Sequence, residues 1–374
     1  MFRIPSFRKI VRKANSGSLT SRPKVGRRRR LGCEPLECRQ LLAIDTSVAL
    51  IEPPDSGVFG EQLSFVAEVT PAETQSGTLT GTATLLDGET TLSTVDVVDG
   101  SATFDISSLA VGTHSITVIY SGDETFSTST SSSAALDVSR ASTSAVLVAD
   151  SVATTYGDLL TFTVTVGVDS PGAGALTGSV TFKDGTTELG TVDLSGEGTA
   201  VFTSYTVGAG DHSITATYNG DTNFAESSTD GELAVSVSPA TLVVTAIDAN
   251  RVYGAVDPTF TYTITGFKNN ETEAVLAGSP VLTTDADASS SVGSYNVLVD
   301  VNSLSSANYT FEAQDGVLTI DQAATASDLT VSPIWVQVGE QVSLTSSVLE
   351  VAPGSGTPTG TVTFMDGETV LDTQ

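Results

Sequence analysis

The chain has 374 residues, too many for one ordinary hydrophobic core and enough for three or four domains of about 100 residues each. Its 34 glycines and its aromatic content of only 6% favour short strands joined by many turns, so we expect an all-β protein. The formal net charge of −28 comes from the residues after 43, and this acidic part would repel phosphate backbones and anionic lipids, which argues against nucleic-acid binding by the modules.

The charge is unevenly distributed along the chain. Residues 1–43 hold twelve of the 16 Lys and Arg residues and two acids, Glu34 and Glu37, which leaves 16 − 12 = 4 basic and 44 − 2 = 42 acidic residues for the rest. The acidic part should attract divalent cations diffusely, so weak calcium association is expected. Both cysteines, Cys33 and Cys38, lie in the basic part without a second pair or a nearby histidine, so the sequence does not predict a zinc site.

The N-terminal segment, residues 1–43, has neither the apolar stretch of a standard secretory signal nor a run long enough to span a bilayer. We expect it to be disordered and removable. Its last part, LGCEPLECRQLLA from Leu31, resembles the LEPR-XLL type segment of large surface or secreted proteins of planctomycetes and other bacteria. The resemblance implies a role in export or sorting. Composition alone also fits a solvated basic tail, a transit peptide or a nucleic-acid arm.

Two matched segments organise the next part of the chain. HSITVIYSGDETF begins at His114, and HSITATYNGDTNF begins at His212, which is 212 − 114 = 98 residues later. The repeat predicts two modules, 44–139 and 140–239, each with six or seven short strands and frequent turns. This is the pattern of an immunoglobulin-like β-sandwich without the Cys and Trp of antibody domains.

Each module has the same internal signals. The pairs Asp87-Gly88 and Asp184-Gly185 predict tight hairpin turns, because they supply the positive φ that such a turn requires. Alternating runs predict which side chains face the core: Leu63, Phe65, Ala67, Val69, Ile116, Val118 and Tyr120, with equivalents Leu160, Phe162, Val164, Val166, Ile214, Ala216 and Tyr218. The motif G-x-V-T-F-x-D-G followed by H-S-I-T-A-x-Y-x-G-D-x-x-F resembles the bacterial Ig-like repeat found in tandem on large surface proteins.

The period changes after the second module. Residues 240–321 resemble the MBG-type module, a smaller mostly-β domain, through Tyr253-Gly254, Thr265-Gly266-Phe267 and Asn308-Tyr309-Thr310-Phe311. We expect a separate core there and a turn at Asn269-Asn270. Residues 322–374 repeat the Ig-like pattern but lack its returning strands, so we expect an incomplete third Ig-like module with an exposed core face. We therefore expect a piece of a longer protein, or an unstable last module.

The sequence predicts no catalytic, cofactor-binding or metal-ligating residues. His114 and His212 have no evident partner Cys, Asp or Ser at matched positions, which favours structural strand-start residues at the sandwich edge. Gly122-Asp123 and Gly220-Asp221 are expected to form turns. Calcium bridging at module junctions is the weaker alternative there and at Asp285 and Asp287, because calcium needs six or more oxygens. The sequons at Asn270 and Asn308 are expected to be accidental.

These features predict a non-catalytic, secreted or cell-surface stalk of a bacterium that contributes to adhesion, with surface or matrix proteins or polysaccharides as partners. Short linkers such as Ser238-Pro239-Ala240 should limit bending, so a rod is the expected shape. One alternative is an array that recognises carbohydrate or protein, although Trp335 is the only Trp available for such a surface. Another is the non-catalytic N-terminal part of a larger secreted enzyme.

Overall fold

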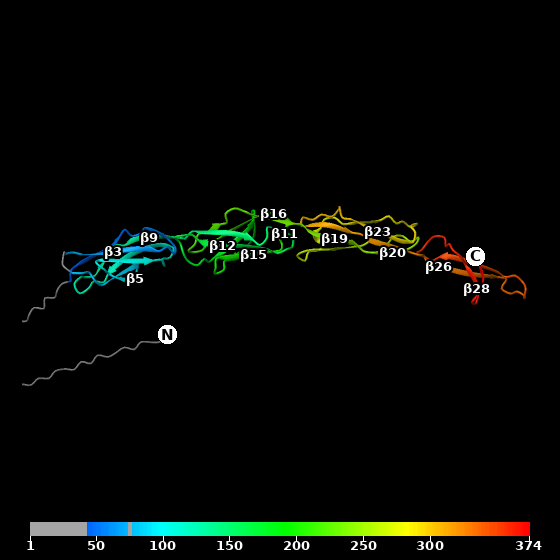
Figure 1. Cartoon of the computed structure of the whole chain (residues 1–374), viewed down its shortest axis with the longest axis horizontal. Helices are drawn as coiled ribbons and strands as arrows, with labels where there is room; N and C mark the ends of the chain where they lie inside the picture. The colour runs from blue at the N-terminus through cyan, green and yellow to red at the C-terminus, as the bar shows by residue number, and fades with distance from the viewer. Residues whose placement is uncertain (1–42, 74–76) are drawn as a thin grey trace, which may run out of the picture. The chain divides into compact units, whose positions relative to one another are not determined.

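The computed structural model describes residues 43–73 and 77–374 (Figure 1). The expected export segment and the LEPR-XLL resemblance, apart from Ala43, lie outside the described residues. None of the helices in the two described ranges has the length and apolarity of a membrane span.

The first module is built from two facing sheets. One has the strand order β1-β3-β6, and the other has the order β2-β9-β7-β4-β5 with β8 paired to β7. The strands are β1 (Thr46–Ile51), β2 (Ser56–Val58), β3 (Leu63–Pro71), β4 (Thr82–Asp87), β5 (Thr90–Asp96), β6 (Ser101–Ile106), β7 (Gly112–Tyr120), β8 (Ser129–Thr130) and β9 (Ala134–Ser139).

The second module repeats this topology strand for strand, which confirms the duplication and the tandem β-sandwich fold. Its sheets have the orders β10-β12-β15 and β11-β18-β16-β13-β14, with β17 paired to β16. The strands are β10 (Thr143–Ala149), β11 (Ala153–Thr155), β12 (Leu160–Val168), β13 (Ser179–Asp184), β14 (Thr187–Asp193), β15 (Thr199–Ser204), β16 (Gly210–Tyr218), β17 (Ser227–Ser228) and β18 (Leu233–Ser238).

The alternating runs fill the cores of both sandwiches, as predicted. Every second residue of β3 and of β12 is buried, and the opposite residues of each strand are more exposed. Phe65 lies opposite Phe104 and Phe162 lies opposite Phe202, so each core is built on a cross-strand aromatic pair. Burying one such side chain contributes about 1.5 to 3 kcal/mol, which explains how each module can fold without a disulfide. All fourteen side chains predicted to face the core are buried.

The two hairpins differ from the prediction in one respect. Gly88 and Gly185 have φ values of 56° and 54°, as the turn requires. The aspartates do not take a positive φ, because Asp87 and Asp184 are the last residues of β4 and β13. Their side chains are thereby held at the strand end beside a neighbouring strand.

The third module has its own core, as expected. One sheet has the order β21-β19-β24 and the other β20-β25-β23-β22. Its core includes Val244, Val297, Leu318 and Ile320. Asn269 and Asn270 have φ values of 52° and 59°, which confirms the predicted turn. The elements are β19 (Ala240–Ala246), β20 (Ala249–Val252), β21 (Tyr262–Thr265), the 3-10 turn η1 (Glu273–Val275), β22 (Val281–Thr284), β23 (Gly293–Asp300), β24 (Tyr309–Gln314) and β25 (Gly316–Asp321).

The C-terminal segment forms two hairpins with an open apolar side. β26 (Thr325–Ser332) pairs with β27 (Ser343–Glu350), and β28 (Thr363–Asp366) pairs with β29 (Thr369–Thr373). Leu329 and Val331 of β26 hold the positions of Leu147 and Ala149, which pack against the core of the second module, yet they are 57% and 37% exposed. The expected exposed core face is therefore present.

Candidate functional site

Each Ig-like module contains a histidine held between two hydrogen-bond acceptors. In the first module, His114 Nδ1 lies 2.7 Å from Asp87 Oδ2, and His114 Nε2 lies 2.8 Å from the Ala110 carbonyl oxygen. The Asp87 Oδ1 atom accepts the backbone N–H of Ser115 at 3.0 Å. This set of contacts, here called the His–Asp clasp, fixes the end of the β4–β5 hairpin to strand β7.

The second module repeats the clasp with the same distances. His212 Nδ1 lies 2.7 Å from Asp184 Oδ2, and Nε2 lies 2.8 Å from the Gly208 carbonyl oxygen. The backbone N–H of Ser213 donates to Asp184 Oδ1 at 3.0 Å. The sequence prediction that the histidines lack a matched partner was therefore wrong. The partner lies 27 residues upstream in the first module and 28 in the second.

The partners determine the protonation state of the clasp. A carboxylate and a carbonyl can only accept, so the contacts are all satisfied when both imidazole nitrogens donate, which favours the positively charged ring. Partial burial opposes this charge, but the hydrogen bonds to Asp87 and Ala110 and the charges of Asp87 and Asp137 outweigh it and raise the pKa of His114. Partial burial also disfavours a charge on His212. The hydrogen bonds to Asp184 and Gly208 and the charges of Asp184 and Asp211 outweigh this effect, so the pKa of His212 is raised.

This geometry does not suit a catalytic triad. A triad histidine uses one nitrogen to hold the carboxylate and the other to receive a proton from a nucleophile. In both clasps the second nitrogen is hydrogen-bonded to a backbone carbonyl, so no hydroxyl or thiol is in the nucleophile's position. The histidine side chains are only 11% and 13% exposed, which further limits access of a substrate. The strands that carry them are central in their sheets rather than at an edge.

In the loops after β7 and β16, the carboxylate of the Gly-Asp pair accepts hydrogen bonds that hold the loop in place. Asp123 Oδ1 accepts the backbone N–H groups of Thr125 and Phe126 at 2.8 Å each, and Oδ2 accepts the N–H and hydroxyl of Thr80 at 3.0 and 2.8 Å. Partial burial disfavours the charge, but these bonds outweigh it and lower the pKa of Asp123 to about 2. The turn interpretation of Asp123 thus agrees with the structure.

Asp221 makes the same four contacts in the second module, with Asn223, Phe224 and both groups of Thr177 as donors. Burial disfavours the charged carboxylate of Asp221 as well. The hydrogen bonds from Thr177 and the loop outweigh this effect and lower the pKa of Asp221. A carboxylate with four internal donors has few lone pairs left for a cation. Elsewhere, Asp287 accepts from Ser289 and Ser290 in its own turn. Across the described ranges, no cluster of three or more His, Cys, Asp or Glu side chains could hold a metal ion.

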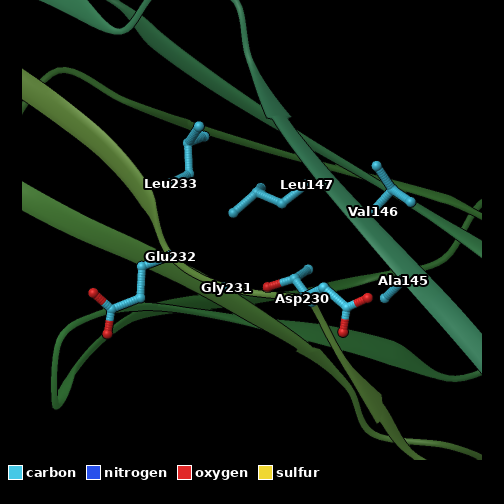
Figure 2. A pocket seen from close by; sticks show the side chains of 8 residues that line it. Ala145, Val146, Leu147, Asp230, Gly231, Glu232 and Leu233 are labelled. Carbon is cyan, nitrogen blue, oxygen red and sulfur yellow. The ribbon is translucent and has the colours of Figure 1, made fainter.

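The second module has a shallow cavity of about 200 Å³ between β10 and the loop before β18. Figure 2 shows its apolar wall, with Leu147 and Leu233, and the acidic side chains of Asp230 and Glu232 on its rim. The two carboxylates do not point to a common centre, and Glu232 accepts the hydroxyl of Ser213. The cavity therefore provides neither a cation cage nor a nucleophile beside a base.

Comparison with protein families identifies the modules. The sequence profile of the bacterial Ig-like domain (group 3) matches residues 50–139 and 147–238. The profile of the MBG domain (YGX type) matches residues 242–319. The central part of the chain, residues 50–319, is built from two bacterial Ig-like domains and one MBG domain. Both family resemblances predicted from the repeated motifs are thereby confirmed.

Several solved structures show low similarity to this chain. Invasin, described as a bacterial integrin-binding protein, is 12% identical with a TM-score of 0.36, over 76% of this chain and 61% of its own. FdeC, an Escherichia coli adhesin, is 17% identical with a TM-score of 0.29, over 74% and 96%. The Yersinia pseudotuberculosis adhesin InvE is 15% identical with a TM-score of 0.28, over 51% and 58%. No curated protein matches this chain.

Proposed function

We propose that this chain is a force-bearing, non-catalytic stalk of a bacterial surface or secreted protein. The observation that carries the proposal is a parallel strand pair that recurs in both Ig-like domains and in the MBG domain. A strand near the start of each domain pairs in parallel with its last strand: β2 with β9, β11 with β18, and β20 with β25.

These pairs are closed by backbone hydrogen bonds at both ends. In the first domain, the N–H of Asp137 donates to the Asp55 carbonyl at 3.0 Å, and the N–H of Phe59 donates to the Ser139 carbonyl at 2.9 Å. In the second, the N–H of Ser236 donates to the Val152 carbonyl at 2.9 Å. We refer to each parallel pair with its closing bonds as a terminal clamp.

A terminal clamp resists tension because of its direction. In a parallel pair, the beginning of the first strand and the end of the last strand lie at opposite ends. A pull on the two chain ends therefore slides one strand along the other and loads all the hydrogen bonds together. In an antiparallel pair pulled at one open end, the bonds would break one at a time at lower force.

The connections between domains are short enough to transmit tension directly. β9 ends at Ser139 and β10 begins at Thr143, and β18 ends at Ser238 while β19 begins at Ala240. Little slack lies between one terminal clamp and the next domain, which supports the proposed stalk. The domain limits that we propose are 44–139, 140–239, 240–321 and the incomplete 322–374, after an export segment at 1–43.

A surface or secreted location fits the proposal, since a stalk acts by holding other parts away from a cell or matrix. We propose surface or matrix proteins or polysaccharides as its partners. The side chains of the clasp and of the Gly-Asp loops are all hydrogen-bonded within their own domain, which supports a structural role over a catalytic one.

Single-molecule force spectroscopy on the full chain tests this function. Ser236→Pro removes the backbone N–H that closes the clamp of the second domain, whereas Ser236→Ala keeps it. Both variants lose the hydroxyl bond to Asp211, so they form a matched pair. The proposal predicts that Ser236→Pro lowers the unfolding force of one domain and that Ser236→Ala leaves it near the wild-type value. Equal forces in the two variants would show that the clamp does not bear the load.

A further inference from the structure

An aromatic residue followed by glycine recurs at a spacing of 97 residues through three domains. The pairs are Phe59-Gly60, Tyr156-Gly157 and Tyr253-Gly254. Each lies in a tight turn closed by a backbone bond of 3.0 to 3.1 Å: Glu61 N–H to Val58 O, Asp158 N–H to Thr155 O, and Ala255 N–H to Val252 O. The glycines have φ values of 79°, 87° and 80°, as the third position of a type II turn requires.

The turn is attached to the point where the chain leaves each domain. The N–H of the aromatic residue donates to the carbonyl at the end of the last strand: Phe59 to Ser139, Tyr156 to Ser238, and Tyr253 to Asp321. The aromatic residue and its glycine are therefore presented beside the start of the following domain. We name this feature the aromatic–glycine turn.

At the first junction, the turn contacts the second domain. Phe59 packs against the hydrophobic core of the second domain and forms an edge-on pair with Phe224, with ring centroids 5.5 Å apart. The N–H of Ala173 donates to the Phe59 carbonyl at 3.3 Å. A Cβ atom at Gly60 would lie 1.9 Å from the Ala173 carbonyl oxygen, so the close approach requires glycine. Phe59 does not belong to the core of its own domain.

At the second junction, the turn contacts the MBG domain. Tyr156 forms an edge-on pair with Tyr309, with ring centroids 5.4 Å apart. Both phenols donate to one carboxylate, Tyr156 to Glu271 Oε1 at 2.8 Å and Tyr309 to Glu271 Oε2 at 2.6 Å. A Cβ at Gly157 would lie 2.5 Å from the Lys268 Cβ.

Two side-chain bonds complete the second junction. Asn308 Oδ1 accepts the N–H of Ala209 at 2.9 Å, and the Asn269 amide donates to the Tyr205 carbonyl at 3.0 Å. Asn308 also belongs to a glycosylation pattern in the sequence, but its side chain here serves the junction. The contacts therefore combine apolar packing with polar groups that fix the direction of approach.

At the third junction, the turn contacts the C-terminal segment. The N–H of Ser355 donates to the Tyr253 carbonyl at 3.2 Å, and its hydroxyl donates to the Gly254 carbonyl at 2.8 Å. A Cβ at Gly254 would lie 2.4 Å from the Ser355 carbonyl oxygen, and one at Gly356 would lie 2.9 Å from the Tyr253 ring.

The two Ig-like receivers share a sequence. The turn of the preceding domain meets Pro171-Gly172-Ala173-Gly174 in one case and Pro353-Gly354-Ser355-Gly356 in the other. In both loops the third residue donates its N–H to the aromatic residue's carbonyl, and the fourth residue is a glycine that leaves room for the ring. Docking element and receiver thus recur together along the chain.

A fourth copy of the turn, at residues 337–340, forms without contacting a neighbouring domain. The N–H of Glu340 donates to the Gln337 carbonyl at 3.0 Å, and Gly339 has a φ of 96°. The aromatic position is Val338, which is fully exposed, and a Cβ at Gly339 meets no heavy atom of the described residues within 4 Å. The backbone of the turn therefore does not need a docked neighbour. The aromatic side chain and the close backbone contact at the glycine occur only in the three copies that meet a neighbouring domain.

We propose that the aromatic–glycine turn is a docking element that fixes the orientation of each domain against the next, with the Pro-Gly-x-Gly loop as its receiver on Ig-like domains. The inference does not depend on the force-bearing function, because docking can set orientation whether or not the chain carries tension. The terminal clamp could likewise resist force if the junctions were loose.

The first junction can be tested in the full chain with Cys33→Ser and Cys38→Ser. Spin labels at Ser108→Cys and Glu197→Cys, two exposed positions in successive domains, report the distance distribution between them. Gly60→Ala should broaden the distribution several-fold, because its Cβ would overlap Ala173. The matched control is Gly231→Ala, since Gly231 has a φ of 78° with nothing within 4 Å of its Cβ. This control should keep the narrow wild-type distribution.

Phe59→Ala provides a second variant that spares the backbone of the turn. It should also broaden the distribution while hydrogen exchange of β3 in the first domain stays unchanged, because Phe59 packs against the neighbouring core. If Gly60→Ala and Phe59→Ala both keep the narrow distribution, docking through the turn is wrong. A distance distribution in the wild type as broad as that in Phe59→Ala would also show that docking through the turn is wrong.

Discussion

The His–Asp clasp of the first Ig-like domain makes a quantitative prediction for Asp87→Asn. The asparagine keeps one oxygen for the Ser115 N–H, but its other end is an amide that cannot accept from His114 Nδ1. The loss is one charge-assisted hydrogen bond at 2.7 Å, to a histidine that is 11% exposed, so we expect a destabilisation of about 2 kcal/mol. For a domain of this size, that corresponds to about 10 °C in Tm.

Hydrogen exchange of the full chain measures this effect one domain at a time. The free energy of opening comes from peptides of β7, and β16 serves as an internal reference because its clasp with Asp184 is intact. Asp96→Asn, an exposed aspartate at the end of β5, is the control and should change the free energy by less than about 0.5 kcal/mol.

The stabilisation that the clasp provides should decrease as the pH rises. The pKa of His114 is raised in the folded domain, so the clasp contributes fully below about pH 6.5 and its contribution is lost as the pH rises through the folded-state pKa. The gap between wild type and Asp87→Asn should therefore be largest at pH 6 and smaller at pH 9. A gap below about 0.5 kcal/mol at pH 6, or one that grows with pH, would show that the charged histidine does not stabilise the domain.

Three further predictions concern the loops, the cations and the N-terminal segment. Asp123→Ala should destabilise the first domain by about 2 kcal/mol at pH 7 in urea unfolding. Because the pKa of Asp123 is lowered to about 2, the wild-type advantage should be lost as the pH falls from about 4 towards 2; an unchanged gap at pH 2 would contradict the assignment. The chain should melt within about 8 °C in calcium and in chelator, and a larger shift would reveal a calcium site. Deleting residues 1–43 should abolish export from the native cells, whereas normal secretion would exclude an export role.

The architecture could be predicted because its signals are local and duplicated. Alternation in β3 and β12 identified the buried side chains, and the 98-residue offset of the His-Ser-Ile-Thr strands identified the repeated unit. The positive φ of Gly88 followed from turn chemistry. The position of Asp87 did not, because its place at the end of β4 follows from its pairing with Thr90 across the hairpin.

The clasp was missed because its residues are far apart in the sequence. Asp87 had an apparent role in the hairpin, and only the pairing of β4 with β7 brings it to His114. The signal was nevertheless present, since each copy has an Asp-Gly followed by a His at nearly the same separation. The aromatic–glycine turn had a similar signal, in that Phe59, Tyr156 and Tyr253 keep a constant spacing across two families of domain. Which surface each ring contacts depends on long-range packing and could not be predicted from that spacing.

The force-bearing proposal depends on the direction in which a domain is loaded, so one domain should be pulled in two directions. Tension applied through the chain ends shears the clamp between β11 and β18. Tension applied through cysteines at Ser179 and Asp193, which face each other at the open end of the β13–β14 hairpin, peels that pair apart. We expect a clearly higher unfolding force through the chain ends than through the hairpin. Equal forces in the two directions, or a lower force through the chain ends, would show that these domains are not built to carry load along the chain.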